Sequence, residues 1–168
     1  MEKLSARNLV SAVLVFVALA GLTICPSRAE DSADKAKLIQ DEFAGWSNNM
    51  DQLLTVFTED VIYEDVTMGV VNHNKEEVRG FASGFFSAFP DIRFAVDSAL
   101  IIGNHAAVEW TVTGTQTGDM PGMPASNRRA TLRGVSIIEF GGGKIARQTD
   151  YWDLATLLRQ LGFLPPPK

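Results

Sequence analysis

The spacing of apolar residues predicts that the first ordered part of the chain is helical. In residues 31–58 apolar side chains recur at helical intervals, as at Leu38, Phe43 and Trp46, and Leu53 continues the same face. The polar residues that follow Trp46 interrupt this pattern, so we expect the helix to break there.

A short strand and a second helix are predicted next. Residues 59–66 alternate in the way that a strand does. Residues 74–89 have helical spacing, with Asn74 as a predicted N-cap and Glu77 three positions on as its capping-box partner. Pro90 cannot continue the helix.

The second half of the chain is dominated by alternating segments. Four strands are predicted, followed by a helix at 154–162 that Gly162 closes. Helices followed by consecutive strands favour an α+β fold, with helices on one face of a curved sheet and an apolar cone between them. A small molecule could occupy that cone. The strands are residues 92–103, 105–118, 129–140 and 144–152, and an irregular loop covers 119–127.

The N-terminus has the pattern of a secretory signal peptide. Lys3 and Arg7 precede an apolar run of 16 residues at 9–24, and Ser27 and Ala29 stand at the positions of a cleavage site. The run is shorter than the roughly 20 residues that span a bilayer. We therefore expect residues 1–29 to be removed and residues 30–168 to form one exported domain, periplasmic or extracellular, without a stable membrane span.

Cys25 is the only cysteine and lies inside this predicted signal. The mature chain would then have no disulfide and no thiolate metal site. Lipidation of Cys25 is the alternative, and it is less favoured because Ile24 stands where a small residue is wanted.

The charge of the chain argues against two classes of partner. Removing residues 1–29 takes away three of the 15 basic and one of the 20 acidic residues, which leaves a formal charge of −7. An acidic domain is a poor ligand for nucleic acid and for an anionic membrane surface. His73 and His105 have no metal-ligand spacing, so we predict no metal and no cofactor.

Two aspartates at the last strand–helix junction are the candidates for chemistry. Asp153 directly precedes the final helix, where a structural N-cap role is favoured over a catalytic one. Asp150 lies in the strand, in phase with Gln148 and Trp152. If that face lines the cone, burial raises the pKa of Asp150 toward neutrality, as a general acid or base requires. A solvated strand face is the other interpretation, and periodicity alone does not choose between them.

Other polar and aromatic strand residues are candidates for ligand binding. Glu109 and Glu139 are expected to face outward. The predicted substrate-binding residues are Tyr63, Asp65, Trp110, Gln116, Ser136 and Gln148.

Several motifs occur in order and at close spacing: FPDIRF, GTQTG, GMPASNRR, GGGKI and DLATLLRQLG. Together they resemble the SnoaL-like polyketide cyclase (ester cyclase) family, in the nuclear transport factor 2-like superfamily. The similarity covers about residues 35–164. Common forms in the family are GTHTG and GMPPTGRR, so Gln116 and PASNRR are mild departures.

The resemblance implies a cone-shaped α+β barrel, a strongly bent antiparallel sheet packed on helices around a ligand cavity. It also implies a catalytic acid/base at Asp150 for an intramolecular aldol ring closure without a metal or organic cofactor. The cyclases carry histidines at two neighbouring positions, where this chain has Ser136 and Gln148. Many relatives form homodimers through the open face of the sheet.

Three functional hypotheses follow. The first is a protein that binds a small apolar carbonyl compound and uses Asp150 in cyclase, lyase or isomerase chemistry. The second is a ligand-binding protein without catalysis, and the third is a protein-interaction domain.

Overall fold

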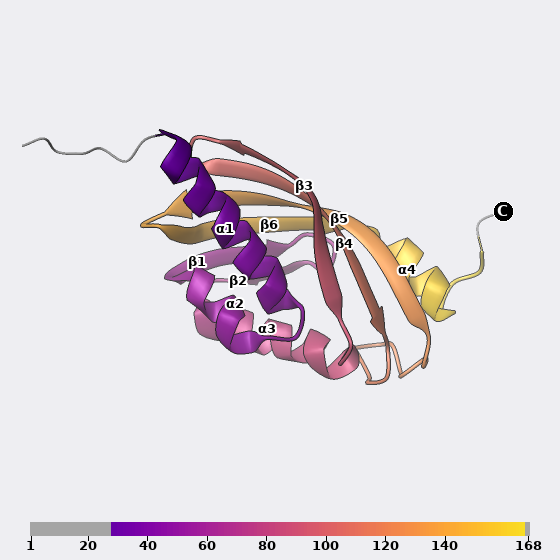
Figure 1. Cartoon of the computed structure of the whole chain (residues 1–168). Helices are drawn as coiled ribbons and strands as arrows, with labels where there is room; N and C mark the ends of the chain where they lie inside the picture. The colour runs from indigo at the N-terminus through magenta and orange to yellow at the C-terminus, as the bar shows by residue number, and fades with distance from the viewer. Residues whose placement is uncertain (1–27, 167–168) are drawn as a thin grey trace, which may run out of the picture.

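The computed structural model describes residues 28–166, which form four helices and one six-stranded, curved sheet (Figure 1). This confirms the α+β prediction. In chain order the elements are α1 (Arg28–Trp46), α2 (Met50–Val56), β1 (Phe57–Asp65), β2 (Val70–Asn72), α3 (Lys75–Ala88), β3 (Arg93–Ile102), β4 (His105–Thr115), β5 (Arg129–Gly141), β6 (Lys144–Trp152) and α4 (Leu154–Leu161).

The strands lie in the order β2-β1-β6-β5-β4-β3. Neighbours are antiparallel, as expected, except for β1 and β6, which run parallel. This exception arises because the last strand enters the sheet between β1 and β5, beside the first strand of the chain. The three-residue strand β2 was not predicted, because a segment so short carries no detectable alternation.

Local sequence signals set the ends of the helices. The predicted break after Trp46 is confirmed: Asn48 adopts a left-handed conformation, with φ of 70°, and Asn49 caps α2. The predicted N-cap of α3 is also confirmed, because the Asn74 side chain accepts from the backbone N–H of Glu77 at 2.9 Å. Gly162 ends α4 with φ of 89°, a conformation that other residues rarely adopt.

The helices cover the concave face of the sheet unequally. In Figure 1, α1, α2 and α3 cross one face, and α4 lies at the far end of the sheet. Side chains such as Ile39, Leu53 and Val108 form one core cluster under α1 and α2, and Leu132 and Leu157 belong to a second cluster toward α4. On β5, buried and exposed residues alternate over most of the strand, so one face of the sheet is closed and the other is open.

Part of the N-terminal prediction concerns residues that the structure does not describe. The apolar run and Cys25 lie outside residues 28–166, so cleavage after Ala29 and export stay predictions. Within residues 28–166, no helix has both the length and the hydropathy needed to cross a bilayer.

Candidate functional site

An aromatic cavity opens between the helices and the concave face of the sheet. Phe43 and Trp46 of α1, Phe81 and Phe85 of α3, and Trp110 of β4 form much of its wall. The volume over which the centre of a water molecule can move is about 80 Å³. That space holds several waters or a small ligand, and its walls are almost entirely apolar.

Asp150 lies in the lining of this cavity. It comes from β6, and its residue is only 7% exposed. Its backbone partner on β5 is Ser136, and its partner on β1 is Asp65. Strand phase left open a cavity wall or a solvated face, and Asp150 lies in the cavity wall.

Three neutral donors surround the Asp150 carboxyl. The hydroxyl of Tyr63 donates to Oδ2 at 2.5 Å, and the hydroxyl of Ser136 donates to Oδ1 at 2.6 Å. The side-chain amide of Gln148 also donates to Oδ1, at 3.0 Å. A carboxylate has about four acceptor positions. Three are occupied, which leaves one on Oδ2 for a ligand.

The balance between burial and these hydrogen bonds sets the pKa of Asp150. Burial raises this pKa from 3.8 to about 6, and the hydrogen bonds from Ser136, Tyr63 and Gln148 limit the rise. The negative charge of Asp65 adds a small further increase. Asp150 therefore exchanges its proton close to neutral pH, where a general acid or base is most effective.

Trp110 and Gly134 organise the floor of the site. The indole Nε1–H of Trp110 donates to the hydroxyl of Ser136 at 2.9 Å, and this hydroxyl in turn donates a hydrogen bond to Asp150. The indole lies across β5 at Gly134: a Cβ there would stand 2.3 Å from the ring. Only glycine permits this close approach.

Asp65 brings a second carboxyl to the lining. Its Oδ2 accepts from the indole of Trp152 at 2.9 Å, and its Oδ1 accepts from the backbone N–H of Met68 at 2.8 Å. Burial raises the pKa of Asp65, and these hydrogen bonds oppose the rise. Through these two hydrogen bonds Asp65 joins the β1–β2 connection to β6 at the edge of the cavity.

Glu42 is a carboxyl that our sequence analysis missed. It lies on α1 with 0% exposure, and neither of its oxygens has a hydrogen-bond partner among the described residues. Burial holds the pKa of Glu42 well above its usual range, and the charge of Asp150 raises it further; Gln148 and Trp46 act in the opposite direction. A signal was present in the sequence, because Glu42 stands four residues before Trp46 on the predicted apolar face.

The predicted binding residues separate into those near Asp150 and one that is remote from the cavity. Tyr63, Asp65 and Trp110 line the cavity, and Ser136 and Gln148 lie behind Asp150 as its donors.

Gln116 does not line the cavity. It is fully buried, donates to the carbonyl of Met123 and accepts from the N–H of Ser126, so it holds the 119–127 loop. Its place differs from expectation because β4 ends at Thr115, three residues before the predicted end of the strand, and the buried Gln116 side chain is bonded to the loop that follows.

Asp153 caps α4, as its position before the helix predicts. Its carboxylate accepts from the backbone N–H of Thr156 at 3.0 Å and from the hydroxyl of the same residue at 2.6 Å. These hydrogen bonds lower the pKa of Asp153. The two aspartates thus have opposite environments, and only Asp150 faces the cavity.

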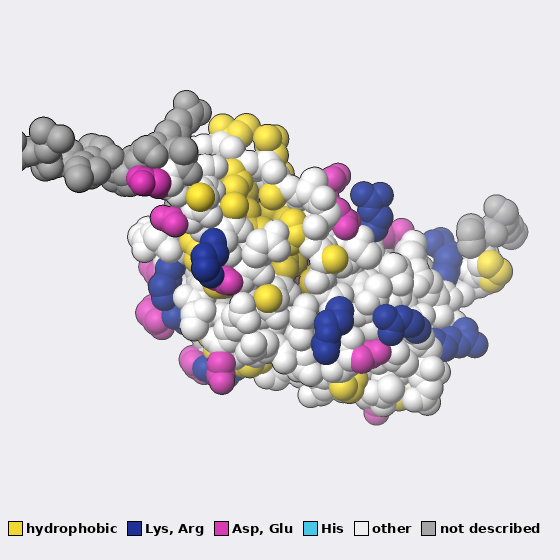
Figure 2. All heavy atoms as spheres, in the orientation of Figure 1, with side chains coloured by type: hydrophobic (Ala, Val, Ile, Leu, Met, Phe, Trp, Pro, Cys, Tyr) yellow, Lys and Arg dark blue, Asp and Glu magenta, His cyan; other side chains and the backbone are white. Residues whose placement is uncertain are grey.

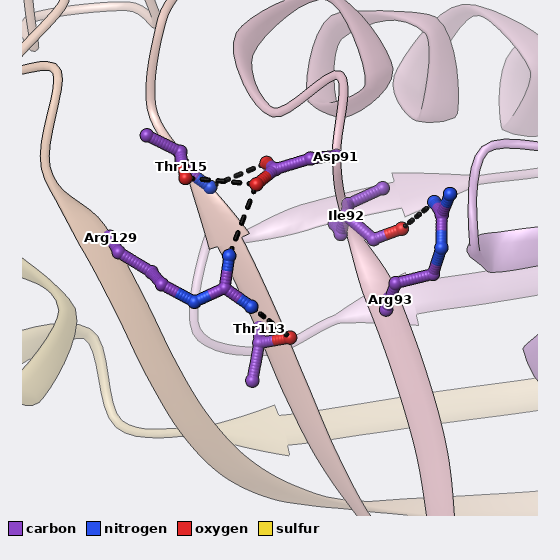
Figure 3. Close-up of polar contacts among 6 residues, drawn as sticks. All are labelled: Asp91, Ile92, Arg93, Thr113, Thr115 and Arg129. Carbon is purple, nitrogen blue, oxygen red and sulfur yellow. Dashed lines mark hydrogen bonds and ion pairs between the residues drawn. The ribbon is translucent and has the colours of Figure 1, made fainter.

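A polar cluster ties together the strand ends near the cavity (Figure 3). Asp91 accepts from the N–H and hydroxyl of Thr115, at 2.6 and 2.9 Å, and from Arg129 at 3.1 Å. Arg129 also donates to the hydroxyl of Thr113, a lining residue, at 3.2 Å. The hydrogen bonds from Thr115 lower the pKa of Asp91, which stays ionised and holds the α3–β3 connection against β4 and β5.

No group of three or more His, Cys, Asp or Glu side chains within residues 28–166 is arranged to hold a metal ion.

Solved structures share this fold. TsrD from Streptomyces laurentii is 26% identical, with a TM-score of 0.72 over 79% of this chain and 97% of its own. AclR from Streptomyces galilaeus is 24% identical, with a TM-score of 0.70 over 82% and 85% of the two chains. A protein from Catenulispora acidiphila with a ketosteroid isomerase-like fold, solved with trimethylamine, is 20% identical, with a TM-score of 0.67 over 77% and 98%.

A search among curated proteins finds no match. The sequence model of the family described as SnoaL-like polyketide cyclase matches residues 38–161, which is most of the chain and includes every residue that lines the cavity. The protein therefore belongs to the SnoaL-like polyketide cyclase family.

Proposed function

We propose that this protein binds a small, largely apolar carbonyl compound of polyketide type, and that Asp150 carries out acid/base chemistry on it, of cyclase, lyase or isomerase kind. One observation carries the proposal: a carboxyl with a pKa of about 6 lies in the wall of an aromatic cavity. The family and the fold support the binding of a small molecule. The reaction is the step that goes beyond them.

In an aldol ring closure, a single carboxyl could act twice. The Asp150 carboxylate would first take a proton from the carbon next to one carbonyl of the substrate. The resulting enolate carbon would attack a second carbonyl, and Asp150 would return the proton to the oxygen of that carbonyl. One C–C bond forms, the carbonyl π bond becomes a hydroxyl, and no proton is gained or lost.

The surroundings of Asp150 suit this double role. The free acceptor position on Oδ2 would receive the proton, and Tyr63, Ser136 and Gln148 would stabilise the carboxylate that is formed or regenerated. Aromatic walls would keep the substrate folded and exclude water, which supplies proximity. Ser136 and Gln148 do not titrate near neutral pH, so Asp150 would be the proton carrier.

Turnover of β-keto esters or polyketide mimics by wild type and Asp150→Asn would test the proposal. We expect the variant to lose at least about 100-fold in rate, the usual contribution of a general acid or base. Asp153→Asn is the matched control, since this exposed cap residue lies three positions away and asparagine is also an N-cap. Unchanged turnover in Asp150→Asn would remove Asp150 from the mechanism.

A non-catalytic binding protein is the second candidate. It is favoured by the neutral side chains, Ser136 and Gln148, that stand where the resemblance implies histidines. Calorimetric binding that persists in Asp150→Asn, with no product from any ligand, would support this function over catalysis.

We also propose that the mature protein is exported and forms a homodimer through the outer face of the sheet. Leu100, Ile102, Ile137 and Tyr151 lie on that face with 45–65% exposure. Figure 2 views the opposite side of the sheet, which the helices cover; there, hydrophobic side chains gather near α1 and the edge strand β3. Mass spectrometry of the N-terminus would separate cleavage after Ala29 from lipidation at Cys25, and light scattering that shows a strict monomer would contradict the dimer.

A further inference from the structure

Four buried polar atoms, on three side chains that lie close together, have no hydrogen-bond partner among the described residues. They are both carboxyl oxygens of Glu42, the indole Nε1 of Trp46 and the side-chain Oε1 of Gln148. Glu42 and Trp46 are four residues apart on α1 and share a face, and Gln148 comes from β6. Gln148 and Trp46 both lower the pKa of Glu42, so both side chains lie close to its carboxyl.

One proton on Glu42 would satisfy this group. A neutral carboxylic acid has a donor and an acceptor, so its O–H can donate to Oε1 of Gln148 while its carbonyl oxygen accepts from Nε1–H of Trp46. An ionised Glu42 can only accept, and it would leave Oε1 of Gln148 unpaired and facing a negative charge. Ionisation without a partner is also costly at full burial.

We propose that Glu42 is a neutral carboxylic acid that holds the amide of Gln148 in place and thereby positions Asp150. The amide has two distinct ends. With its oxygen held by Glu42, its nitrogen is directed to Oδ1 of Asp150, at 3.0 Å, and to the hydroxyl of Ser136, at 3.4 Å. A reversed amide would place an acceptor oxygen against the Asp150 carboxylate.

Glu42 therefore acts through Gln148 and does not itself line the cavity. The titratable groups that face it are Asp150 on β6 and Tyr63 on β1. The importance of this positioning role for turnover rests on the proposed function of Asp150. The protonation state of Glu42 and its effect on the pKa of Asp150 do not depend on that function. Both can be measured on the ligand-free protein.

The first experiment is infrared spectroscopy of the ligand-free protein at about pH 8, two units above the Asp150 midpoint. We expect a carboxylic-acid C=O band in wild type that disappears in Glu42→Gln and remains in Asp150→Asn. If wild type and E42Q show no difference in the carboxylic-acid region, Glu42 is ionised and the proposal is overturned.

The second experiment follows the titration of Asp150 by carboxyl ¹³C NMR in E42Q and Glu42→Leu. The glutamine can donate to Gln148 and accept from Trp46 as a neutral acid does, so E42Q should keep the wild-type midpoint. E42L frees the Gln148 amide, so its midpoint should rise because a donor to the carboxylate is lost.

Two results would contradict the positioning role. A midpoint that falls in both variants would mean that a negative charge had been removed from beside Asp150. An unchanged midpoint in E42L would mean that Gln148 needs no support from Glu42.

Should E42L fail to fold, Glu42→Asp replaces it: its side chain is one methylene shorter, which moves the carboxyl away from Gln148, so we expect it to raise the midpoint likewise. Failure of turnover in any of these proteins leaves both measurements intact.

Discussion

Replacing Asp150 with asparagine should change how the stability of the protein depends on pH. The pKa of this carboxyl is about 6 in the folded protein and 3.8 in a freely solvated chain. The folded state therefore binds the proton more tightly than the unfolded state. The stability that this group contributes is complete below about pH 3.8 and is lost as the pH rises through about 6.

The size of the effect follows from the two pKa values. A difference of about 2 units corresponds to about 3 kcal/mol, since each unit is worth 1.36 kcal/mol. Asp150 is 7% exposed, so little of this is lost to solvent screening. Asparagine removes the pH dependence, but its amide would face the donors of Tyr63, Ser136 and Gln148 and cost about 1–3 kcal/mol at every pH.

Urea unfolding followed by tryptophan fluorescence, from about pH 4 to pH 7.5, would measure this difference. Asp150→Asn should be less stable than wild type at the acid end of this range. As the pH rises to neutral, the difference in the free energy of unfolding should change by about 3 kcal/mol in favour of the variant, so that the gap closes or reverses. Asp153→Asn is the control: because the pKa of Asp153 is lowered from 3.8, its contribution changes mainly below about pH 4, and its gap to wild type should stay nearly constant over this range. A gap between wild type and Asp150→Asn that stays constant with pH would refute the buried-carboxyl argument.

Three further predictions concern the support of the site. Gly134→Ala should cost about 1–3 kcal/mol in urea unfolding, because its Cβ would meet the Trp110 ring at 2.3 Å; an unchanged stability would mean that the indole is free to move. Tyr63→Phe should raise the Asp150 midpoint above about 6 in a ¹³C NMR titration, since it removes a donor to the carboxylate; a lower midpoint would contradict the hydrogen bond. Gln116→Ala should cost about 1–3 kcal/mol and speed proteolysis of the 119–127 loop while leaving the Asp150 midpoint unchanged, and a shifted midpoint would place Gln116 in the site after all.

Most of the fold could be predicted from interactions between residues that are close together in the sequence. The caps at Asn74 and Asp153 and the closing glycine at Gly162 each rest on a contact within four residues, and each lies where the sequence indicates. Strand alternation likewise predicts which face Asp150 shares with Gln148. These features are readable because the interacting groups are neighbours along the chain.

Contacts between distant segments could not be predicted from local patterns. Asp65 meets Asp150 because β1 and β6 are parallel with this register, across 85 positions of sequence. Helical phase could have identified Glu42 as an acid on an apolar face, but only the folded arrangement of the chain brings it near Gln148 on β6. Gln116 was misplaced for a related reason, since nothing in the alternation marks the end of β4 at Thr115.

The insertion of the last strand between β1 and β5 makes the order of synthesis matter. A nascent chain that ends before Lys144 can pair β3, β4 and β5, but its first two strands have no edge to join. Non-local pairing of this kind is slow, because the entropy of closing a long loop is lost before the stabilising contacts between the strands can form. The two halves of the domain would thus assemble only after nearly the whole chain has left the ribosome, with Asp150 acquiring its hydroxyl and amide neighbours in the final step.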